Sequence, residues 1–315
     1  MKKFYLIIIK KNKIIQLFIK MGDNPDELVR KAHSKLTPGF LGKMFSSKES
    51  RVDEAMDLLT SAANMYKIQK NWKKAGETYE ELGRIDGESG GGMGYSYYQD
   101  AAHCFSFIDK NRSDQNLDRA IESCERAGKY MQAGKTSQRI ANELEENFNY
   151  EKAIEKYKKA AEYYSMESQN TKSMQQACLL KVADLMCISN HKDMFTEAPK
   201  IYEKLGMQYL TVPLLKSSAK DMFFKCVMIF IAKKDEVSAE VALKKYLLED
   251  PTFDDTRDSK FLKNAIKFIS DPPDAEAFRK EIQSYKTLRE LDKWKITMFA
   301  MAIKNIEHED EEDLK

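Results

Sequence analysis

Proline and glycine are scarce over most of the first two thirds of the chain. Of the 7 prolines in 315 residues, none lies between residues 39 and 198. Five of the 13 glycines crowd into residues 87–94, which leaves few elsewhere. Because proline interrupts helices and both residue types mark the turns of sheet proteins, their scarcity argues against a turn-rich β fold and favours a succession of helices.

Cysteine pairs and long apolar runs are also missing. The 5 cysteines are an odd number, show no CxxC spacing and have no histidine-rich neighbourhood. They do not form the pattern of a disulfide framework or a zinc site, so we expect reduced thiols packed inside helices. The densest apolar run, residues 222–232, contains Lys225 and is shorter than the ~18 residues of a membrane span. These absences predict a soluble, cytoplasmic protein.

A chain-wide charge of one sign is absent, since 52 basic residues stand against 50 acidic residues and the formal net charge is +2. This balance excludes a global attraction to nucleic acid or anionic lipid. The ends differ, because residues 1–20 contain six lysines and no acid, whereas residues 307–315 contain six acids and one lysine. Residues 1–20 have an apolar core of only six residues and no small-residue cleavage site, which argues against a signal peptide. We interpret them as an N-terminal extension, either preceding a true start at Met21 or forming a short tail.

A recurring helical unit appears after Met21. A bulky residue is followed by alanine three positions later and, four positions after that, by a residue that is usually aromatic. These positions fall on one stripe of a helix, where alanine lets a neighbouring helix approach closely. The pattern is typical of tetratricopeptide-like helix pairs, and its uneven spacing indicates a degenerate solenoid. The units are Trp72/Ala75/Tyr79, Tyr98/Ala101/Phe105, Leu117/Ala120/Cys124, Tyr150/Ala153/Tyr157 and Phe195/Ala198/Tyr202.

We therefore expect an all-α fold, with a solenoid of antiparallel helix pairs over residues 21–250. The glycine-rich residues 87–94 are interpreted as a loop between two of its helices. Further apolar segments predict helices over residues 214–232, 237–248 and 261–269, and two more within residues 275–306. Residues 307–315 are expected to form an acidic tail.

Motifs for catalysis are incomplete. Gly128 and Gly134 resemble the glycines of a phosphate loop, but five residues separate them where the motif requires four, and no strand precedes them. Residues 90–94 lack the spacing of a dinucleotide-binding fingerprint. His103 and Cys104 are adjacent on a helix, where neighbouring side chains point ~100° apart and do not face each other. We expect no catalytic residue, no cofactor, no metal site and no enzymatic activity.

Three features fit a binding surface as well as ordinary structure. The residues between 39 and 47 include four large apolar side chains in a Gly/Ser context, which indicates contact with a membrane or partner, or a loop folded onto the first helices. The acidic end carries one apolar residue, Leu314, and fits either a docking segment or a solvated terminus. Lysine and arginine spread along the solenoid could line a concave face or cover solvated helices.

Five strings of residues, in a consistent order and with compatible spacing, point to one known family. They are residues 62–76, 178–183, 213–225, 291–294 and 310–315. The chain from Met21 to its last residue resembles the soluble NSF attachment proteins, and within them the alpha/beta branch.

This resemblance implies a twisted sheet of antiparallel helices that ends in a helical bundle, here residues 251–306. It implies an adaptor and not an enzyme. Such an adaptor binds assembled SNARE complexes, with syntaxin-type and other SNAREs, and recruits the hexameric ATPase NSF, which separates the SNAREs after vesicle fusion. The resemblance further implies several copies per SNARE bundle, a monomer when free, no nucleic-acid partner, and a cytoplasmic protein that associates peripherally with membranes.

The resemblance also assigns residues to these roles. Phe40, Leu41, Met44 and Phe45 match the family's membrane-contacting loop. Lys129, Lys135, Lys181, Lys220 and Arg257 match its SNARE-binding residues. Asp310, Glu311, Glu312, Asp313 and Leu314 match the end that binds and stimulates the ATPase.

The chain departs from the family at two places. Ala177 stands where the family has a basic residue, and residues 87–94 depart from its tighter helix junction. A general tetratricopeptide-like scaffold or co-chaperone that binds peptide tails is the alternative function.

Overall fold

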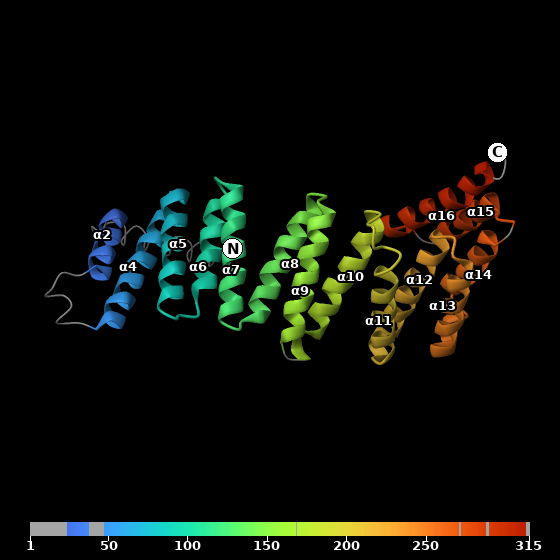
Figure 1. The fold of residues 1–315 in the computed structure, drawn as a ribbon, viewed down its shortest axis with the longest axis horizontal. Helices are drawn as coiled ribbons and strands as arrows, with labels where there is room; N and C mark the ends of the chain where they lie inside the picture. The colour runs from blue at the N-terminus through green and yellow to red at the C-terminus, as the bar shows by residue number, and fades with distance from the viewer. Residues whose placement is uncertain (1–23, 38–46, 168, 271, 288–289, 313–315) are drawn as a thin grey trace, which may run out of the picture. The chain divides into compact units, whose positions relative to one another are not determined.

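The structure is a computed structural model that describes residues 24–37, 47–167, 169–270, 272–287 and 290–312, with residues 308–312 described as backbone only. Helices make up the regular structure of these ranges, which contain no strand (Figure 1). The predicted all-α fold is therefore confirmed. By its internal contacts the chain divides into two compact units, residues 1–136 and 137–315. The domain boundaries predicted after residues 20, 250 and 306 stay predictions.

The first unit is a row of helices in which sequence neighbours pack against one another. Contacts join α2 to α4, α4 to α5, α5 to α6 and α6 to α7, and Figure 1 shows these helices running alternately up and down. This is the arrangement expected of antiparallel helix pairs with short connections. The helices are α2 (Pro25–Leu36), α4 (Lys48–Ile68), α5 (Trp72–Glu88), α6 (Gly94–Phe105), α7 (Lys110–Arg126) and the first part of α8 (Tyr130–Glu146).

The alanine stripe of the sequence lies where helices pack most closely. Ala75, Ala101 and Ala120 are fully buried in this unit, as are Ala153 and Ala198 farther along the chain. Next to Ala75 the helices come so close that only glycine fits. A Cβ atom at Gly76 would lie 2.6 Å from the Phe105 ring. The predicted role of the small residues is confirmed. The Phe195/Ala198/Tyr202 pattern differs from the others. Helix α11 begins at Ala198, so Phe195 lies in the preceding turn and not in the helix.

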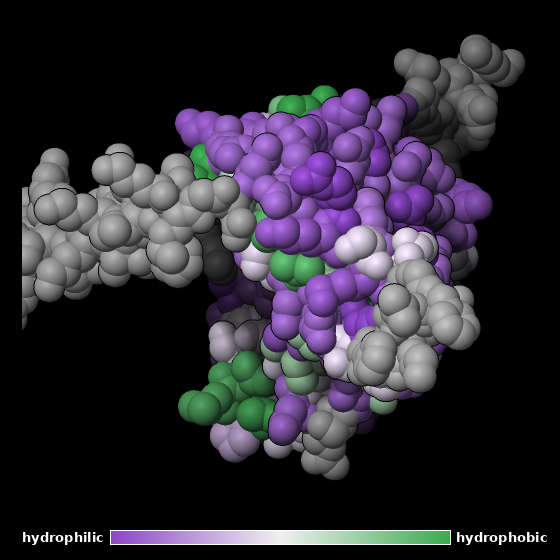
Figure 2. Space-filling view, turned by 90° about the vertical axis from the view of Figure 1, so that its left-hand side faces the viewer, coloured by the Kyte–Doolittle hydropathy of each residue, from purple (hydrophilic) through white to green (hydrophobic). Residues whose placement is uncertain are grey.

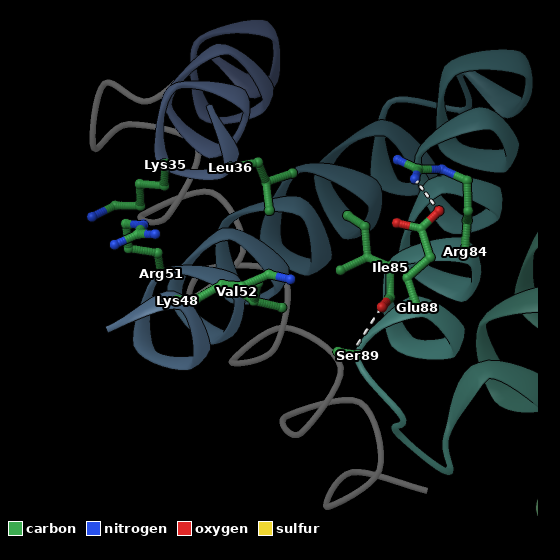
Figure 3. Close-up of a pocket in the computed structure, with 9 residues that line it drawn as sticks. All are labelled: Lys35, Leu36, Lys48, Arg51, Val52, Arg84, Ile85, Glu88 and Ser89. Atoms are coloured by element: carbon green, nitrogen blue, oxygen red, sulfur yellow. Dashed lines mark hydrogen bonds and ion pairs between the residues drawn. The ribbon is translucent and has the colours of Figure 1, made fainter. Parts of the chain in front are cut away.

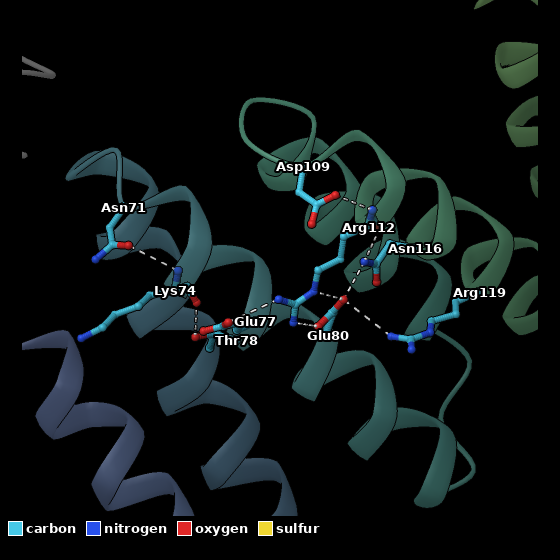
Figure 4. Close-up of polar contacts among 9 residues, drawn as sticks. All are labelled: Asn71, Lys74, Glu77, Thr78, Glu80, Asp109, Arg112, Asn116 and Arg119. Carbon is cyan, nitrogen blue, oxygen red and sulfur yellow. Dashed lines mark hydrogen bonds and ion pairs between the residues drawn. The ribbon is translucent and has the colours of Figure 1, made fainter. Parts of the chain in front are cut away.

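A polar network ties α5 to α7 on the outside of this packing (Figure 4). The Arg112 guanidinium donates from Nη2 to Glu80 Oε2 at 2.6 Å and from Nη1 to Glu77 Oε1 at 3.3 Å, and it lies 4.2 Å from the Phe105 ring centre. Asn116 Nδ2 donates to Glu80 Oε1 at 2.7 Å. The hydrogen bond that Arg112 donates to the Glu80 carboxylate raises the pKa of Arg112 above its ordinary value. Sequence spacing alone does not predict this pairing, because its partners are 32 residues apart.

The second unit combines further helix pairs with a helical bundle at its C-terminal end. Its core is continuous from Ala141 to Ile306, and α12 lies at its centre with 11 buried residues. The elements are the rest of α8, α9 (Tyr150–Met166), η1 (Gln169–Thr171), α10 (Lys172–Ile188), α11 (Ala198–Leu210), η2 (Pro213–Leu215), α12 (Lys216–Ala232), α13 (Glu236–Glu249), η3 (Pro251–Phe253), α14 (Arg257–Ile269), α15 (Ala275–Lys286) and α16 (Lys293–Glu312).

Aromatic rings hold the bundle together. Phe261 lies 4.7 Å from Tyr285 and 5.1 Å from Phe299 between ring centres, which joins α14, α15 and α16. Phe224 of α12 stacks on Tyr285 at 6.1 Å. Such pairs add about 0.5–1.5 kcal/mol each to the area that they bury. The last helices therefore form a packed bundle and not an open end of the solenoid.

All five cysteines are buried and unpaired, as predicted. Burial raises the pKa of Cys104 and Cys124 to about 11, and of Cys178, Cys187 and Cys226 to about 12. A thiolate is the reactive form of cysteine, so these thiols are inert near neutral pH.

We expect the folded protein to react with iodoacetamide at pH 8 at least ~100-fold more slowly than the urea-unfolded protein, because both the thiolate fraction and the access are reduced. The folded state holds these protons more tightly, so its stability is complete below the ordinary thiol pKa and falls as the pH rises toward 11 or 12. Mass spectrometry of labelled cysteines measures the rates. Equal rates in the two states would contradict the buried positions.

Candidate functional site

Lys135 is one of the basic residues predicted to bind SNAREs that are exposed. It lies in the second turn of α8, where Ala133, Gly134 and Thr136 are buried and Lys135 is exposed. The turn is anchored by Gln99 of α6, whose Nε2 donates to Thr136 Oγ1 at 2.8 Å. No acidic side chain among the described residues forms an ion pair with Lys135. Its charge is therefore available to a partner.

Lys129 is instead turned toward its own chain. Its Nζ donates to the Gly92 carbonyl at 2.7 Å and lies 4.9 Å from the centre of the Tyr95 ring. These contacts hold the segment between α5 and α6 against the start of α8. The Lys129 ammonium group thus already interacts with residues of the first unit.

The glycine-rich segment is shorter than predicted. Helix α5 continues through Glu88 and α6 begins at Gly94, so the loop expected over residues 87–94 is confined to residues 89–93. The buried Asp86 carboxylate explains the difference, because its Oδ2 accepts hydrogen bonds from Met93 N at 3.0 Å and Gly94 N at 2.6 Å. It thereby caps α6 from the preceding helix. A Cβ atom at Gly91 would lie 2.2 Å from Asp86 Oδ1, so this approach requires glycine.

In the second unit, Lys181 lies on α10 beside a hollow with a cavity volume of about 620 Å³. Its Nζ forms an ion pair of 2.7 Å with Glu145 Oε1, and the Lys181 side chain keeps 48% of its surface exposed. A pair this exposed is weak, roughly 0–1 kcal/mol. The lysine can therefore exchange Glu145 for an acidic group of a partner.

Lys220 of α12 has a structural partner. Its Nζ donates to the Thr252 carbonyl at 3.0 Å and lies 3.8 Å from Asp250 Oδ2. Asp250 is buried, and this oxygen accepts no hydrogen bond within the described chain. Lys220 therefore offsets a buried negative charge, and reversing its charge would place two carboxylates together.

Arg257 begins α14 and packs on α15. Its guanidinium lies 4.3 Å from the centre of the Tyr285 ring, and Nη2 donates to the Ser284 carbonyl at 3.3 Å. Ala177 is exposed on α10 and lines a second hollow, of about 660 Å³, together with Lys220. The missing basic residue at this position thus leaves a small side chain at the edge of the hollow.

The other predicted site residues lie outside what the structure describes. Phe40, Leu41, Met44 and Phe45 fall within residues 38–46, and Asp313 and Leu314 follow the last described residue. The backbone of Asp310, Glu311 and Glu312 continues α16. These assignments stay predictions.

Sequence reasoning missed an aromatic group beside Lys181. Phe148 is 73% exposed and has a positive φ of 59°, in the turn between α8 and α9. Its ring contacts Tyr150 at 6.1 Å, and Lys293 Nζ lies 5.7 Å from the Phe148 ring centre. The signal in the sequence was an aromatic residue directly before Asn149-Tyr150, at the junction of two predicted helices.

The face of the molecule in Figure 2 is mainly polar. On the face in Figure 2, hydrophilic side chains predominate and hydrophobic ones gather in only a few places. Within the described ranges, no helix has the length and hydropathy needed to cross a bilayer. The same ranges hold no group of three or more His, Cys, Asp or Glu residues that could bind a metal ion. The described residues therefore offer charged and apolar surfaces for contact with partners.

A family model described as "Soluble NSF attachment protein, SNAP" matches residues 23–307. The beta-soluble NSF attachment protein of Bos taurus is 31% identical over 298 residues, covering 94% of this chain and 95% of that protein. The alpha-soluble NSF attachment protein of Homo sapiens is 31% identical over 283 residues, covering 89% and 93%. That of Saccharomyces cerevisiae is 29% identical over 300 residues, covering 92% and 99%. A Pyrococcus horikoshii protein with a tetratricopeptide repeat sensor has 18% identity and a TM-score of 0.38, covering 93% of this chain and 47% of its own.

Proposed function

The chain belongs to the soluble NSF attachment protein family, and we propose that it is an adaptor that binds assembled SNARE complexes and recruits and stimulates the ATPase NSF for their disassembly. The observation that carries this proposal is the family match over residues 23–307. The all-helical fold with its alanine-packed helix pairs is consistent with it. A general tetratricopeptide-like scaffold for peptide tails is not favoured, because the match over residues 23–307 is to one specific family and not to a general helical repeat.

Reconstitution tests this function directly. The purified chain is mixed with an assembled four-helix SNARE complex and with NSF, and recruitment of NSF is measured by co-sedimentation. We expect NSF to join the SNARE complex only when the chain is present, and ATP then to release the individual SNAREs. Recruitment that does not depend on the chain would contradict the proposal, and ATP hydrolysis by the chain alone would contradict a non-enzymatic adaptor.

Lys129, Lys135, Lys181, Lys220 and Arg257 are proposed to contact the acidic surface of the SNARE bundle. Contacts of this kind are salt-sensitive and tolerate different SNARE sequences, because they depend on charge and not on a shaped pocket. The exposed positions of Lys135 and Lys181 support a direct role for them. Lys129 and Lys220 also hold their own chain, so their contribution combines contact with support of the local fold.

Reversing the charge of Lys135 is therefore the cleanest test of this surface. We expect Lys135→Glu to weaken SNARE binding about tenfold at low salt, since an attraction of roughly 1 kcal/mol becomes a repulsion. Fluorescence anisotropy of a labelled SNARE complex measures the affinity, and thermal unfolding checks the fold. Lys73→Glu is the matched control, because Lys73 is an exposed lysine of the same unit outside the proposed set. Equal affinities of the two variants would contradict the assignment of Lys135.

The remaining assignments concern the two ends of the chain. We propose that Phe40, Leu41, Met44 and Phe45 contact the membrane. Through this contact the protein would associate peripherally with the cytoplasmic surface of the membrane. Each large apolar side chain that becomes fully buried contributes about 1.5–3 kcal/mol. Residues 310–314 are proposed to dock on NSF, several copies of the chain to surround one SNARE bundle, and the free protein to be a monomer without a nucleic-acid partner.

A further inference from the structure

A phenylalanine occupies a surface turn in which the rest of the described chain uses glycine or polar residues. Phe148 connects α8 to α9, has a φ of 59° and is 73% exposed. The N–H group of Asn149 donates to the Leu144 carbonyl at 2.9 Å, so Phe148 is the left-handed residue of a Schellman turn that ends α8. A side chain with a Cβ atom is unfavourable in this conformation, because it crowds the neighbouring backbone carbonyl.

The same turn occurs five more times among the described residues, and in none of these copies is the left-handed residue apolar. The residues at this position in the other copies are Lys70, Gly90, Gly128, Asn190 and Lys234. In each copy the residue that follows donates its N–H to the carbonyl five positions earlier, at 2.7 to 2.9 Å. Glycine and asparagine tolerate the left-handed conformation, and a lysine there keeps its ammonium group in water. Phenylalanine has neither property, so the turn itself does not explain Phe148.

Two neighbours orient the Phe148 ring but leave it exposed. The Tyr150 ring meets it edge to face, with ring centres 6.1 Å apart, and Lys293 Nζ of α16 lies 5.7 Å from its centre. Lys293 Nζ also donates to Tyr150 Oη at 2.6 Å and lies 4.9 Å from the centre of the Tyr150 ring. An ammonium group is attracted to the faces of both rings, so Lys293 restricts their positions. A ring that is ordered before binding loses less conformational entropy when a partner covers it.

Phe148 lines the same hollow as Lys181, which is proposed to contact the SNARE bundle. Two lysines, Lys181 and Lys293, and two glutamates, Glu145 and Glu146, line this hollow, so the formal charges of its lining cancel. The net charge of the hollow therefore gives no preference for an anion. Its distinctive feature is apolar surface, which the Phe148 ring adds beside the Lys181 ammonium group.

We propose that Phe148 is an apolar anchor of the SNARE-binding surface and packs on an apolar side chain exposed on a helix of the assembled SNARE bundle. A helix that contacts Lys181 lies within reach of the ring, because both residues line one hollow. Aromatic rings that a partner covers carry a large share of the binding free energy at interfaces. This inference rests on the SNARE contact of Lys181 in the proposed function, and it adds a contact that depends on apolar burial and not on charge.

Fluorescence anisotropy of a labelled SNARE complex with the full chain tests the proposal, at a low and at a moderate salt concentration. We expect Phe148→Asn to weaken binding roughly tenfold at both concentrations, because salt does not screen an apolar contact. Lys181→Gln should weaken binding mainly at low salt. Asparagine suits the turn, as Asn190 does in another copy of it, so the thermal unfolding midpoint of Phe148→Asn should not fall. Leu248→Asn is the matched control, since it removes an apolar side chain of the same unit that is 83% exposed.

A fluorescent label at the same position identifies the partner that covers it. All five cysteines of the chain are buried, so Phe148→Cys supplies one accessible thiol for a dye whose emission depends on its surroundings. We expect the emission to shift to shorter wavelength when the assembled SNARE complex is added, and the same dye on Leu248→Cys to remain unchanged. A shift with NSF alone, or with increasing concentration of the labelled chain alone, would place Phe148 in a different interface and overturn the proposal.

The affinities also separate this inference from the proposed function. If the wild type binds the SNARE complex and Lys181→Gln weakens it, an unchanged affinity of Phe148→Asn would overturn the apolar anchor alone. A loss in Phe148→Asn that disappears at moderate salt, or an equal loss in Leu248→Asn, would do the same. No binding of the SNARE complex by the wild type would overturn the proposed function, and this inference with it.

Discussion

Leu314→Ala is expected to raise the concentration of this protein needed for half-maximal stimulation of NSF by roughly 15- to 60-fold. Truncation removes two to three buried carbon groups at about 0.8 kcal/mol each if Leu314 is the apolar contact of the acidic end. SNARE binding should be unchanged, because the residues proposed for it lie elsewhere. Steady-state ATP hydrolysis by NSF on immobilised SNARE complexes measures the effect.

Leu248→Ala is the matched control for this prediction. Leu248 is a leucine of α13 that is 83% exposed, so the same chemical change is made away from the proposed docking segment. Neutralising the neighbouring acids, in Glu311→Gln/Glu312→Gln, should instead slow association and reduce its dependence on salt. Full stimulation by Leu314→Ala would show that the ATPase contact is made by other residues.

Phe223→Ala is expected to destabilise the second unit by about 3–5 kcal/mol, the largest effect of any single substitution considered. Phe223 of α12 is completely buried and stacks on Tyr246 with ring centres 4.3 Å apart. Helix α11 comes so close that a Cβ atom at Gly206 would lie 2.5 Å from the ring. Rigid backbone on that side cannot collapse into the space left by the ring, so the cavity persists.

Urea unfolding followed by circular dichroism measures this loss of stability. In thermal unfolding the same loss lowers the midpoint by on the order of 10 °C. Phe148→Ala provides the same substitution at a ring that is 73% exposed, and should change stability by no more than about 0.5 kcal/mol. A loss below ~1 kcal/mol in Phe223→Ala would contradict the packing of α11 on α12.

The helical repeat could be predicted from the sequence because its cause is local. Alanine three residues after a bulky side chain marks a stripe that a neighbouring helix covers, and Ala75, Ala101 and Ala120 are indeed fully buried. The 87–94 prediction was too long for a non-local reason. Asp86 turns its carboxylate back to the first turn of α6, so helix continues on both sides of a shorter loop.

The resemblance predicts a set of site residues, and that set stays a prediction, but the surroundings of each residue could not be predicted from the sequence. The resemblance marks Lys129, Lys135 and Lys220 alike, yet their surroundings differ. Lys129 donates to Gly92, 37 residues away, and Lys220 to Thr252, 32 residues away, whereas Lys135 faces solvent. Side-chain direction depends on which helices pack together, and a single sequence does not state these pairings.

The sequence by itself determined the fold class, the positions of close helix packing and the family, because periodicity and residue strings are properties of order along the chain. Tertiary structure alone decided which charges are free. It also placed Lys35, Arg51 and Arg84 around one hollow (Figure 3), although they lie far apart in sequence, because α2 and α5 end beside the start of α4. Electrostatic potential sums over space, so a cluster drawn from three helices leaves no run of charge in the sequence.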